Sequence, residues 1–223
     1  MTGEKHLTVA VTGPTGTFGF GLIPLLQADD RVARIVGIAR RPFDPAAHGW
    51  TKLEYRRGDV RDPEALREAF AGADVVVHLA FLITGTAPAE VIRAVNVDGT
   101  LNAFRAAAVV GAQRFVYASS VAAYGFHPDN PVGMTEEWPV RPAARLFYAQ
   151  EKAELERLLR AEADRPGADV PTGPRCTCCA RRWCWGRTRW APRTSCPGRS
   201  RRSAASWPAG SAGSRCRCPR RSR

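Results

Sequence analysis

The sequence predicts an α/β fold, a doubly wound parallel sheet with helices between its strands. Three observations support this prediction. Apolar strand signals alternate with helix signals over residues 7–163, the strand signals are short and rich in β-branched residues, and a glycine-rich turn joins the first strand to the first helix. In such a sheet, right-handed crossovers bring the carboxyl ends of the strands to one edge, where ligands bind.

The predicted elements follow one another without long gaps. Strands are predicted at residues 7–11, 33–39, 53–58, 74–80 and 114–120, and helices at 18–26, 63–70, 89–110 and 147–163. The second helix has a clear local start, because Asp62 can cap it and Pro63 suits its first turn. Five strands separated by helices are therefore expected.

Glycines at positions 13, 16 and 19 follow the first strand. Glycine allows positive φ and a close backbone approach, and a helix N-terminus offers unpaired N–H groups to an anion. Strand, glycine turn and helix together predict a pyrophosphate site for a dinucleotide, in preference to a plain tight turn.

Two arginines, Arg40 and Arg41, end the second strand. In a nucleotide-binding βαβ unit this position faces the adenosine ribose, where an acid would bind the 2′-hydroxyl of NAD and an arginine would accommodate the 2′-phosphate of NADP. Two arginines without an acid favour NADP over NAD. The alternative is that both side chains simply face solvent.

Polar residues also stand on the fourth and fifth strands. His78 lies in an apolar strand with no second ligand nearby, so it is interpreted as a buried core histidine and no metal is expected. Ser119 and Ser120 end the fifth strand, at the edge of the sheet where the ligand is expected.

Tyr148 and Lys152 are four residues apart in an amphipathic segment, so their side chains share one helix face. An ammonium beside a phenol favours the phenolate and brings a tyrosine into range as a general acid or base near neutral pH. A hydroxyl such as that of Ser120 can hold a substrate oxygen against the tyrosine. The combination suits hydride transfer at a carbinol or carbonyl carbon. The alternative is a surface lysine packed on a half-buried tyrosine.

Composition divides the chain into two parts. Residues 1–166 hold 19 Lys and Arg against 20 Asp and Glu, whereas residues 167–223 hold 14 Arg, one acid and all seven cysteines. We therefore expect a nucleotide-binding domain at 1–166 and a separate tail at 167–223. The start of the chain lacks a basic and then apolar leader, and no apolar run approaches the roughly 20 residues of a membrane helix, so a cytoplasmic location is expected.

The tail lacks the residues that build a core. After Val170 it contains no Leu, Ile, Val, Phe, Met or Tyr, so it is expected to be disordered. A zinc module from Cys176, Cys178, Cys179 and Cys184 lacks paired spacing and histidine. An arginine-rich segment that binds nucleic acid is electrostatically possible but is not favoured.

The favoured hypothesis is a frameshift in a GC-rich gene. If the frame is moved one base back, Cys178 followed by Cys179 must encode Leu, and Trp183 followed by Cys184 must encode Val, whatever codons were used. With GC-rich codons the segment that starts at Arg175 becomes Leu-Tyr-Leu-Leu-Arg-Pro-Ala-Val-Val-Leu-Gly-Pro, a typical strand and turn. Sequencing the gene across codons 165–176 tests the hypothesis, and an intact frame there excludes it.

The chain resembles the extended group of the short-chain dehydrogenase/reductase superfamily, the NAD-dependent epimerase/dehydratase family. The resemblance covers about residues 7–164, in the family's order. The matching segments are TGPTGTFG at 12–19, Asp59-Val60, His78-Leu79-Ala80, NVDGT at 96–100, SSVAAYG at 119–125, and Tyr148 with Lys152. Members of the family continue into a sixth strand and a substrate-binding lobe. In this chain we expect that lobe to be missing or disordered.

The resemblance implies a Rossmann-like fold and a role for each matching residue. Ser120 would orient the substrate, with Ser119 the less favoured neighbour, Tyr148 would be the catalytic acid or base, and Lys152 would bind the nicotinamide ribose. The cofactor would be lined by Gly13, Thr15, Gly16, Thr17, Phe18 and Gly19 at the pyrophosphate, by Asp59 and Val60 at the adenine, and by Leu79, Ala80 and Asn96 at its middle. Arg40 and Arg41 stand where NAD-preferring members of the family usually carry an acidic residue, so this position departs from their pattern.

The resemblance also implies an NAD- or NADP-dependent oxidoreductase, epimerase or dehydratase acting on a sugar nucleotide or similar hydroxyl compound. The runner-up is a non-catalytic NAD(P)-binding sensor, against which the intact Tyr148 and Lys152 pair argues. Family members commonly dimerise through two long helices, here residues 89–110 and 148–163. Because the substrate lobe would lie after the break in composition, the chain is expected to bind cofactor weakly, or to fold marginally, and to turn over little.

Overall fold

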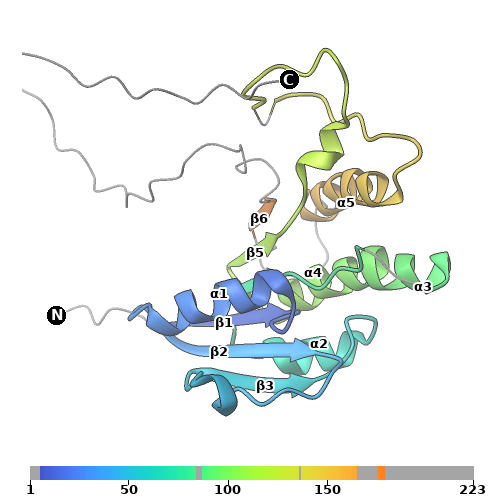
Figure 1. Cartoon of the computed structure of the whole chain (residues 1–223). Coiled ribbons are helices and arrows are strands. Elements are labelled where there is room, and N and C mark those ends of the chain that lie inside the picture. Colours follow the sequence, from blue (N-terminus) through green and yellow to red (C-terminus); the bar gives the residue numbers. More distant parts are fainter. Residues whose placement is uncertain (1–5, 84–86, 136, 165–174, 179–223) are drawn as a thin grey trace, which may run out of the picture. The chain divides into compact units, whose positions relative to one another are not determined.

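The computed structural model describes residues 6–83, 87–135, 137–164 and 175–178 of the chain. Within these ranges six strands form one parallel sheet in the order β3-β2-β1-β4-β5-β6 (Figure 1). The strands are β1 Leu7–Thr12, β2 Val32–Ala39, β3 Leu53–Arg57, β4 Val75–His78, β5 Arg114–Tyr117 and β6 Arg175–Cys178. The order reverses direction after β1, which confirms the predicted doubly wound α/β fold.

Helices connect the strands at nearly the predicted positions. The α-helices are α1 Thr17–Ala28, α2 Pro63–Phe70, α3 Ala89–Arg93, α4 Gly99–Val109 and α5 Phe147–Ala163, with short turns η1 Ala46–His48, η2 Ala94–Asp98 and η3 Val121–Tyr124. Asp62 caps α2 as predicted, because its carboxylate accepts hydrogen bonds from the amides of Glu64 and Ala65.

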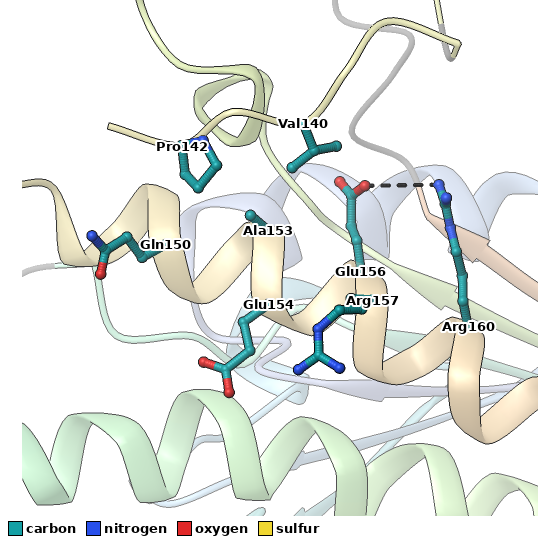
Figure 2. Close-up of a pocket in the computed structure, with 8 residues that line it drawn as sticks. All are labelled: Val140, Pro142, Gln150, Ala153, Glu154, Glu156, Arg157 and Arg160. Carbon is teal, nitrogen blue, oxygen red and sulfur yellow. Dashed lines mark ion pairs between the residues drawn. The ribbon is translucent and has the colours of Figure 1, made fainter. Parts of the chain in front are cut away.

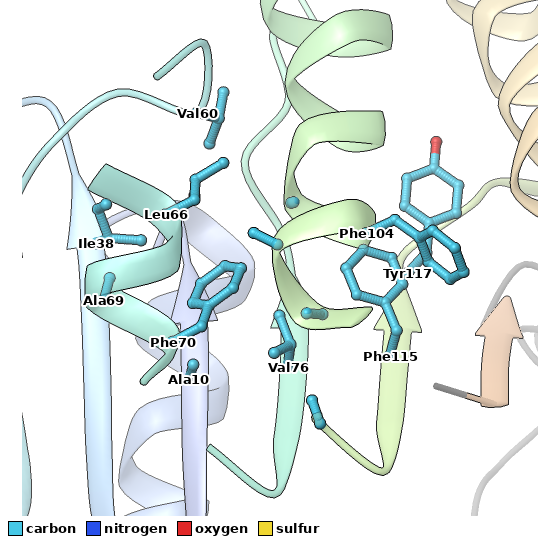
Figure 3. Close-up of a cluster of buried hydrophobic side chains, with 14 of the residues drawn as sticks. Ala10, Ile38, Val60, Leu66, Ala69, Phe70, Val76, Phe104, Phe115 and Tyr117 are labelled. Atoms are coloured by element: carbon cyan, nitrogen blue, oxygen red, sulfur yellow. The ribbon is translucent and has the colours of Figure 1, made fainter. Parts of the chain in front are cut away.

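Alternate residues of the strands face two different apolar clusters. Ala10, Val76 and Phe115 pack with side chains of α2, α4 and α5 on one face of the sheet (Figure 3). Val9 and Val11 face the other side, where Ile23 of α1 covers them. Because side chains alternate along a strand, each buried strand contributes to both layers, which explains its continuous apolar sequence.

Two predicted elements differ from the structure. The helix predicted at 89–110 is interrupted by the five-residue π-helical turn η2, whose middle residue Asn96 is completely buried. Residues 175–178 form β6 beside β5, so the expectation of disorder in the tail does not extend to these four residues. Backbone pairing with the edge of β5 explains this, because it needs no apolar side chains. The other residues of 167–223 lie outside the described ranges.

The glycine turn after β1 brings backbone segments into close contact. Gly13 has a φ of +68°, in the left-handed region that suits glycine. A Cβ on Gly19 would lie 2.3 Å from the carbonyl oxygen of Pro14 and 2.5 Å from that of Gly13. The absence of a side chain at position 19 therefore lets α1 start directly against the turn. In the parts of the chain that the structure covers, no helix is long and apolar enough to cross a membrane.

We predict that Gly19→Ala lowers the free energy of unfolding by about 2 kcal/mol, because the new methyl group overlaps backbone atoms that cannot move aside. Gly21→Ala is the matched control in the same helix, since a Cβ there meets nothing within 4 Å. It should be neutral or stabilising by up to about 1 kcal/mol. Urea unfolding followed by circular dichroism measures both, and equal stabilities of the two variants would contradict the prediction.

Candidate functional site

A cavity of about 220 Å³ lies at the carboxyl ends of β1, β2 and β4. It is lined by Gly13, Thr15, Gly16, Ile38, Ala39, Arg40, Arg41, Gly58, Val60, Leu79, Ala80, Phe81, Leu82 and Val95. Eight of the predicted cofactor residues are in this set: Gly13, Thr15, Gly16, Arg40, Arg41, Val60, Leu79 and Ala80. This is the edge of a doubly wound sheet where the reversal of strand order opens a crevice.

The other predicted cofactor residues do not line this cavity. Thr17 and Phe18 are exposed at the start of α1, and Gly19 is buried against the turn. Helix α1 has Gly16 at its N-cap and no side-chain cap there, so its first amides remain suited to an anion. Asn96 is completely buried.

Asp59 is held by a neighbouring arginine. The Arg61 guanidinium donates two hydrogen bonds to the Asp59 carboxylate, at 2.7 and 3.1 Å. Hydrogen bonding from Arg61 lowers the pKa of Asp59, and the charge of Arg40 adds to the effect. The Asp59 carboxylate is therefore ionised and paired with Arg61.

The backbone that carries Arg40 and Arg41 is fixed by β3. The Tyr55 hydroxyl bonds with the carbonyl oxygens of Ala39, at 3.0 Å, and of Arg41. Arg57 donates from Nε to the carbonyl oxygen of Arg40 at 3.1 Å. The side chains of Arg40 and Arg41 are themselves exposed at the rim of the cavity.

A buried hydrogen-bond chain runs beneath the glycine turn. The amides of Leu79 and Ala80 donate to Thr12 Oγ1 at 3.2 Å, so the Thr12 hydroxyl donates its hydrogen to His78 Nδ1 at 2.9 Å. The Thr100 hydroxyl donates to the carbonyl oxygen of Asn96 at 2.5 Å and accepts from His78 Nε2 at 3.0 Å. This arrangement assigns the neutral Nε2–H tautomer to His78.

His78 is the buried core histidine that the sequence predicts. Its side chain is 1% exposed and both ring nitrogens have threonine partners. Burial lowers its pKa to about 3, and the charge of Lys152 acts in the same direction. The ring therefore stays neutral at physiological pH and acts as a structural link between β1, β4 and α4.

Asn96 connects the loop after β4 to α5. Its side-chain oxygen accepts from the Leu82 amide at 2.7 Å, and its side-chain nitrogen donates to the Leu82 carbonyl oxygen at 2.9 Å and to Glu151 Oε2 at 2.7 Å. Leu82 lines the cavity. Asn96 thus shapes the cavity wall through Leu82.

Lys152, Tyr148 and Phe81 meet beside this wall. Lys152 is 3% exposed, and its Nζ lies 3.5 Å from the ring centroid of Phe81 and 5.7 Å from that of Tyr148. The Phe81 and Tyr148 rings meet edge to face, with centroids 5.6 Å apart. Phe81 also lines the cavity, so the predicted Tyr148 and Lys152 pair adjoins it.

The two serines after β5 have different partners. Ser119 Oγ donates to Glu156 Oε1 at 2.6 Å. Ser120 caps the short η3 turn, where its Oγ accepts from the Ala122 amide at 3.2 Å. Among the described contacts, no hydrogen bond joins either serine directly to Tyr148, so their common role remains a prediction.

Several residues of the site were missed by sequence reasoning. Phe81 directly follows the His-Leu-Ala motif, and its position could have indicated contact with Lys152. Glu151 and Glu156 are buried carboxylates at helical spacing from Leu155 and Leu159 of α5. Their spacing placed them on the inner face, but only their partners in the tertiary structure, Asn96 and Ser119, explain why that burial is possible.

A larger hollow, of about 560 Å³, lies along α5 and the loop before it (Figure 2). Its lining residues are Val140, Pro142, Gln150, Ala153, Glu154, Glu156, Arg157 and Arg160. Neither Tyr148 nor Lys152 lines it. We therefore assign the chemistry to the smaller cavity and regard this hollow as a surface feature of α5.

Comparison with known proteins establishes the family. The model of the NAD dependent epimerase/dehydratase family matches residues 9–179, and the chain belongs to this family. It is 33% identical over 166 residues to sterol demethylase protein B of Methylococcus capsulatus, an alignment that covers 74% of this chain and 49% of that protein. It is 31% identical over 175 residues to the L-arabinose 1-dehydrogenase (NAD(P)(+)) of Haloferax volcanii, covering 73% and 63%.

The fold is also shared with solved structures. MoeE5 in complex with UDP-glucose and NAD has a TM-score of 0.58 and is 30% identical, over 71% of this chain and 50% of MoeE5. The chain thus spans about half to two thirds of the length of these relatives.

We predict that acid destabilises the protein through His78. In the unfolded chain a histidine takes up a proton near pH 6.5, whereas folded His78 does so only near pH 3. Stability is therefore lost as the pH falls below about 6.5, by about 2 kcal/mol between pH 7 and pH 5. Urea unfolding at the two pH values measures the loss.

His78→Gln should be less stable at pH 7 but should show a flatter pH dependence, because the titrating group is gone. His6→Gln is the control, since His6 is exposed, and it should keep the full dependence. A wild-type free energy of unfolding that stays constant from pH 7 to pH 5 would contradict the prediction.

Proposed function

We propose that the chain carries the catalytic half of an NAD(P)-dependent oxidoreductase, epimerase or dehydratase that acts on a sugar nucleotide or a similar hydroxyl compound. The observation that carries this proposal is the position of Tyr148 and Lys152 beside the cavity, in contact with its lining residue Phe81. The substrate class is supported by relatives whose names include an L-arabinose dehydrogenase and a protein bound to UDP-glucose and NAD.

Each residue would contribute one function. Lys152, whose Nζ donates to the Ala118 carbonyl oxygen at 2.7 Å, would place a positive charge near the Tyr148 phenol. Tyr148 would accept the proton of a substrate hydroxyl, or return it to a carbonyl oxygen. Ser120 would donate a hydrogen bond to that same oxygen. A nicotinamide bound in the cavity would supply or accept the hydride.

The residues fit such a cofactor. Gly13 and Gly16 provide backbone without side chains at the uncapped start of α1, where a pyrophosphate can approach. Val60 offers an apolar wall and Arg40 and Arg41 offer positive charge at the other end. In the predicted arrangement, these arginines would contact the adenosine end of the cofactor, and Tyr148 and Lys152 would contact its nicotinamide end.

We propose further that the cofactor is NADP in preference to NAD. The ends of β2 and β3 carry more positive than negative side chains. The arginines are Arg40, Arg41, Arg57 and Arg61, and the acidic residue is Asp59. Because Arg61 already neutralises Asp59, the arginines leave an excess of positive charge for a 2′-phosphate.

The double substitution of Arg40→Gln with Arg41→Gln should weaken NADPH binding about tenfold or more and change NADH binding little, since only the former carries a 2′-phosphate. Arg34→Gln is the control on the same strand, because Arg34 pairs with Glu54. Titration followed by nicotinamide fluorescence measures both affinities. An unchanged ratio of the NADPH and NADH dissociation constants in the double variant would refute the preference.

Self-association through α4 and α5 is also proposed. Val109 of α4 is 63% exposed, and the hollow along α5 is lined by the apolar Val140 and Pro142 of the preceding loop and by Ala153 of α5, together with charged Glu and Arg side chains (Figure 2). Apolar and charged side chains occur together at protein interfaces. Sedimentation equilibrium tests whether the chain is a homodimer.

Tyr148→Phe distinguishes an enzyme from a non-catalytic sensor. We expect low turnover from the chain, since residues 171–223 contain no Leu, Ile, Val, Phe, Met or Tyr for an apolar substrate site. The variant should lose about 10²-fold or more of that turnover and keep its cofactor affinity. Turnover is followed by nicotinamide absorbance with a panel of sugar nucleotides.

Tyr124→Phe serves as the control, because the Tyr124 hydroxyl donates to the backbone carbonyl oxygen of Thr135 at 3.3 Å and Tyr124 does not line the cavity. A sensor would bind cofactor equally well in all three forms and show no turnover in any of them. Activity that survives Tyr148→Phe unchanged would end the proposal.

A further inference from the structure

Two hydrogen bonds join α5 to the segment after β5. Lys152 Nζ donates to the Ala118 carbonyl oxygen at 2.7 Å, and Ser119 Oγ donates to Glu156 Oε1 at 2.6 Å. Lys152 and Glu156 are one helical turn apart, and each is 3% exposed. Two successive residues of the loop are thus held by two successive turns of the helix.

The bond to Glu156 determines what Ser119 can do. A serine hydroxyl has one hydrogen, and a buried carboxylate is the strongest acceptor within reach. While Ser119 donates to Glu156, it has no hydrogen left for a substrate oxygen. Arg160 also faces this carboxylate, with Nη2 3.9 Å from Oε2, so the charge of Glu156 has a cation on its outer side (Figure 2).

Ser120 accepts a hydrogen bond, whereas Ser119 donates one. Its backbone is extended, with φ −152° and ψ 145°, so its side chain departs on the other side of the chain from that of Ser119. Its Oγ accepts from the Ala122 amide, a bond that uses an oxygen lone pair and leaves the hydroxyl hydrogen for donation. Ser120 is therefore equipped as a donor to a substrate oxygen.

We propose that Glu156 is a positioning residue that binds Ser119 and so presents Ser120 as the substrate-orienting hydroxyl. This inference rests on the proposed function, because it needs a substrate oxygen for Ser120 to hold. Glu156 itself does not touch the reacting atoms. It acts by fixing the loop from Ala118 to Ala122 against the helix that also carries Tyr148 and Lys152.

The first test follows the loop itself and needs no turnover. Hydrogen–deuterium exchange in the wild-type chain should show a protected Ala122 amide. Glu156→Ala should speed its exchange about tenfold or more, because the loop loses its anchor. Glu156→Gln keeps an oxygen that accepts from Ser119 and should restore most of the protection. Amides of β1 should be unaffected in both variants.

Glu162→Ala is the control on the same helix, since Glu162 pairs with Arg105, and it should leave Ala122 protected. If Glu156→Ala exposes all amides equally, Glu156 serves only global stability and the inference is overturned. If Ala122 exchanges at the wild-type rate in Glu156→Ala, the carboxylate does not hold the loop and the inference is overturned as well.

The second test measures hydride transfer in a single turnover at saturating cofactor. Ser120→Ala should lose about 10²-fold, and Glu156→Ala and Ser119→Ala about tenfold each, with cofactor affinity unchanged. Combining the latter two substitutions should lose no more than either alone, because they break one bond. Glu156→Gln should recover most of the rate.

The two proposals fail in different ways. If Ser120→Ala and Tyr148→Phe leave the rate unchanged, or no turnover is found, the proposed function fails, and the exchange data still decide whether Glu156 holds the loop. If those two variants are inactive but Glu156→Ala keeps the wild-type rate, the proposed function stands and the positioning role is refuted.

Discussion

The hydrogen-bond chain through His78 is the constraint on which the structure around the glycine turn depends. It joins the end of β1 at Thr12, the end of β4 at His78 and the π-helical turn through Thr100 and Asn96. Each hydroxyl has its donor and acceptor roles fixed by a backbone partner. Because the histidine must be neutral for the chain to close, a buried ring between two threonines fixes the spacing of three elements around the glycine turn.

Three charged side chains of helix α5 are buried. Glu151, Lys152 and Glu156 are all buried, and each one contacts a loop at the carboxyl edge of the sheet: Leu82 through Asn96, Ala118 directly, and Ser119. Burial of such groups is unfavourable unless each is hydrogen-bonded. The helix therefore positions loops through polar contacts, and Leu155 and Leu159 supply its apolar packing.

The site thus has two parts with different origins. The cavity is formed by backbone near glycines and by apolar side chains at the strand ends, so it depends on the sheet. The Tyr148 and Lys152 pair belongs to α5 and reaches the cavity through Phe81. The chain belongs to the NAD dependent epimerase/dehydratase family, and its alignments cover 49% of sterol demethylase protein B and 50% of MoeE5.

Periodicity and turn residues correctly predicted the fold class, the first five strands and the N-cap of α2, because these are local properties of the sequence. The glycines, the arginines, Tyr148 and Lys152 of the candidate site were also singled out by local spacing, and their roles stay predictions. Local signals could not show that Asn96 sits in a π-helical turn or that β6 pairs with β5. The partners of Phe81, Glu151 and Glu156 follow from tertiary contacts, because a buried carboxylate or a lysine over a ring depends on residues far away in the chain.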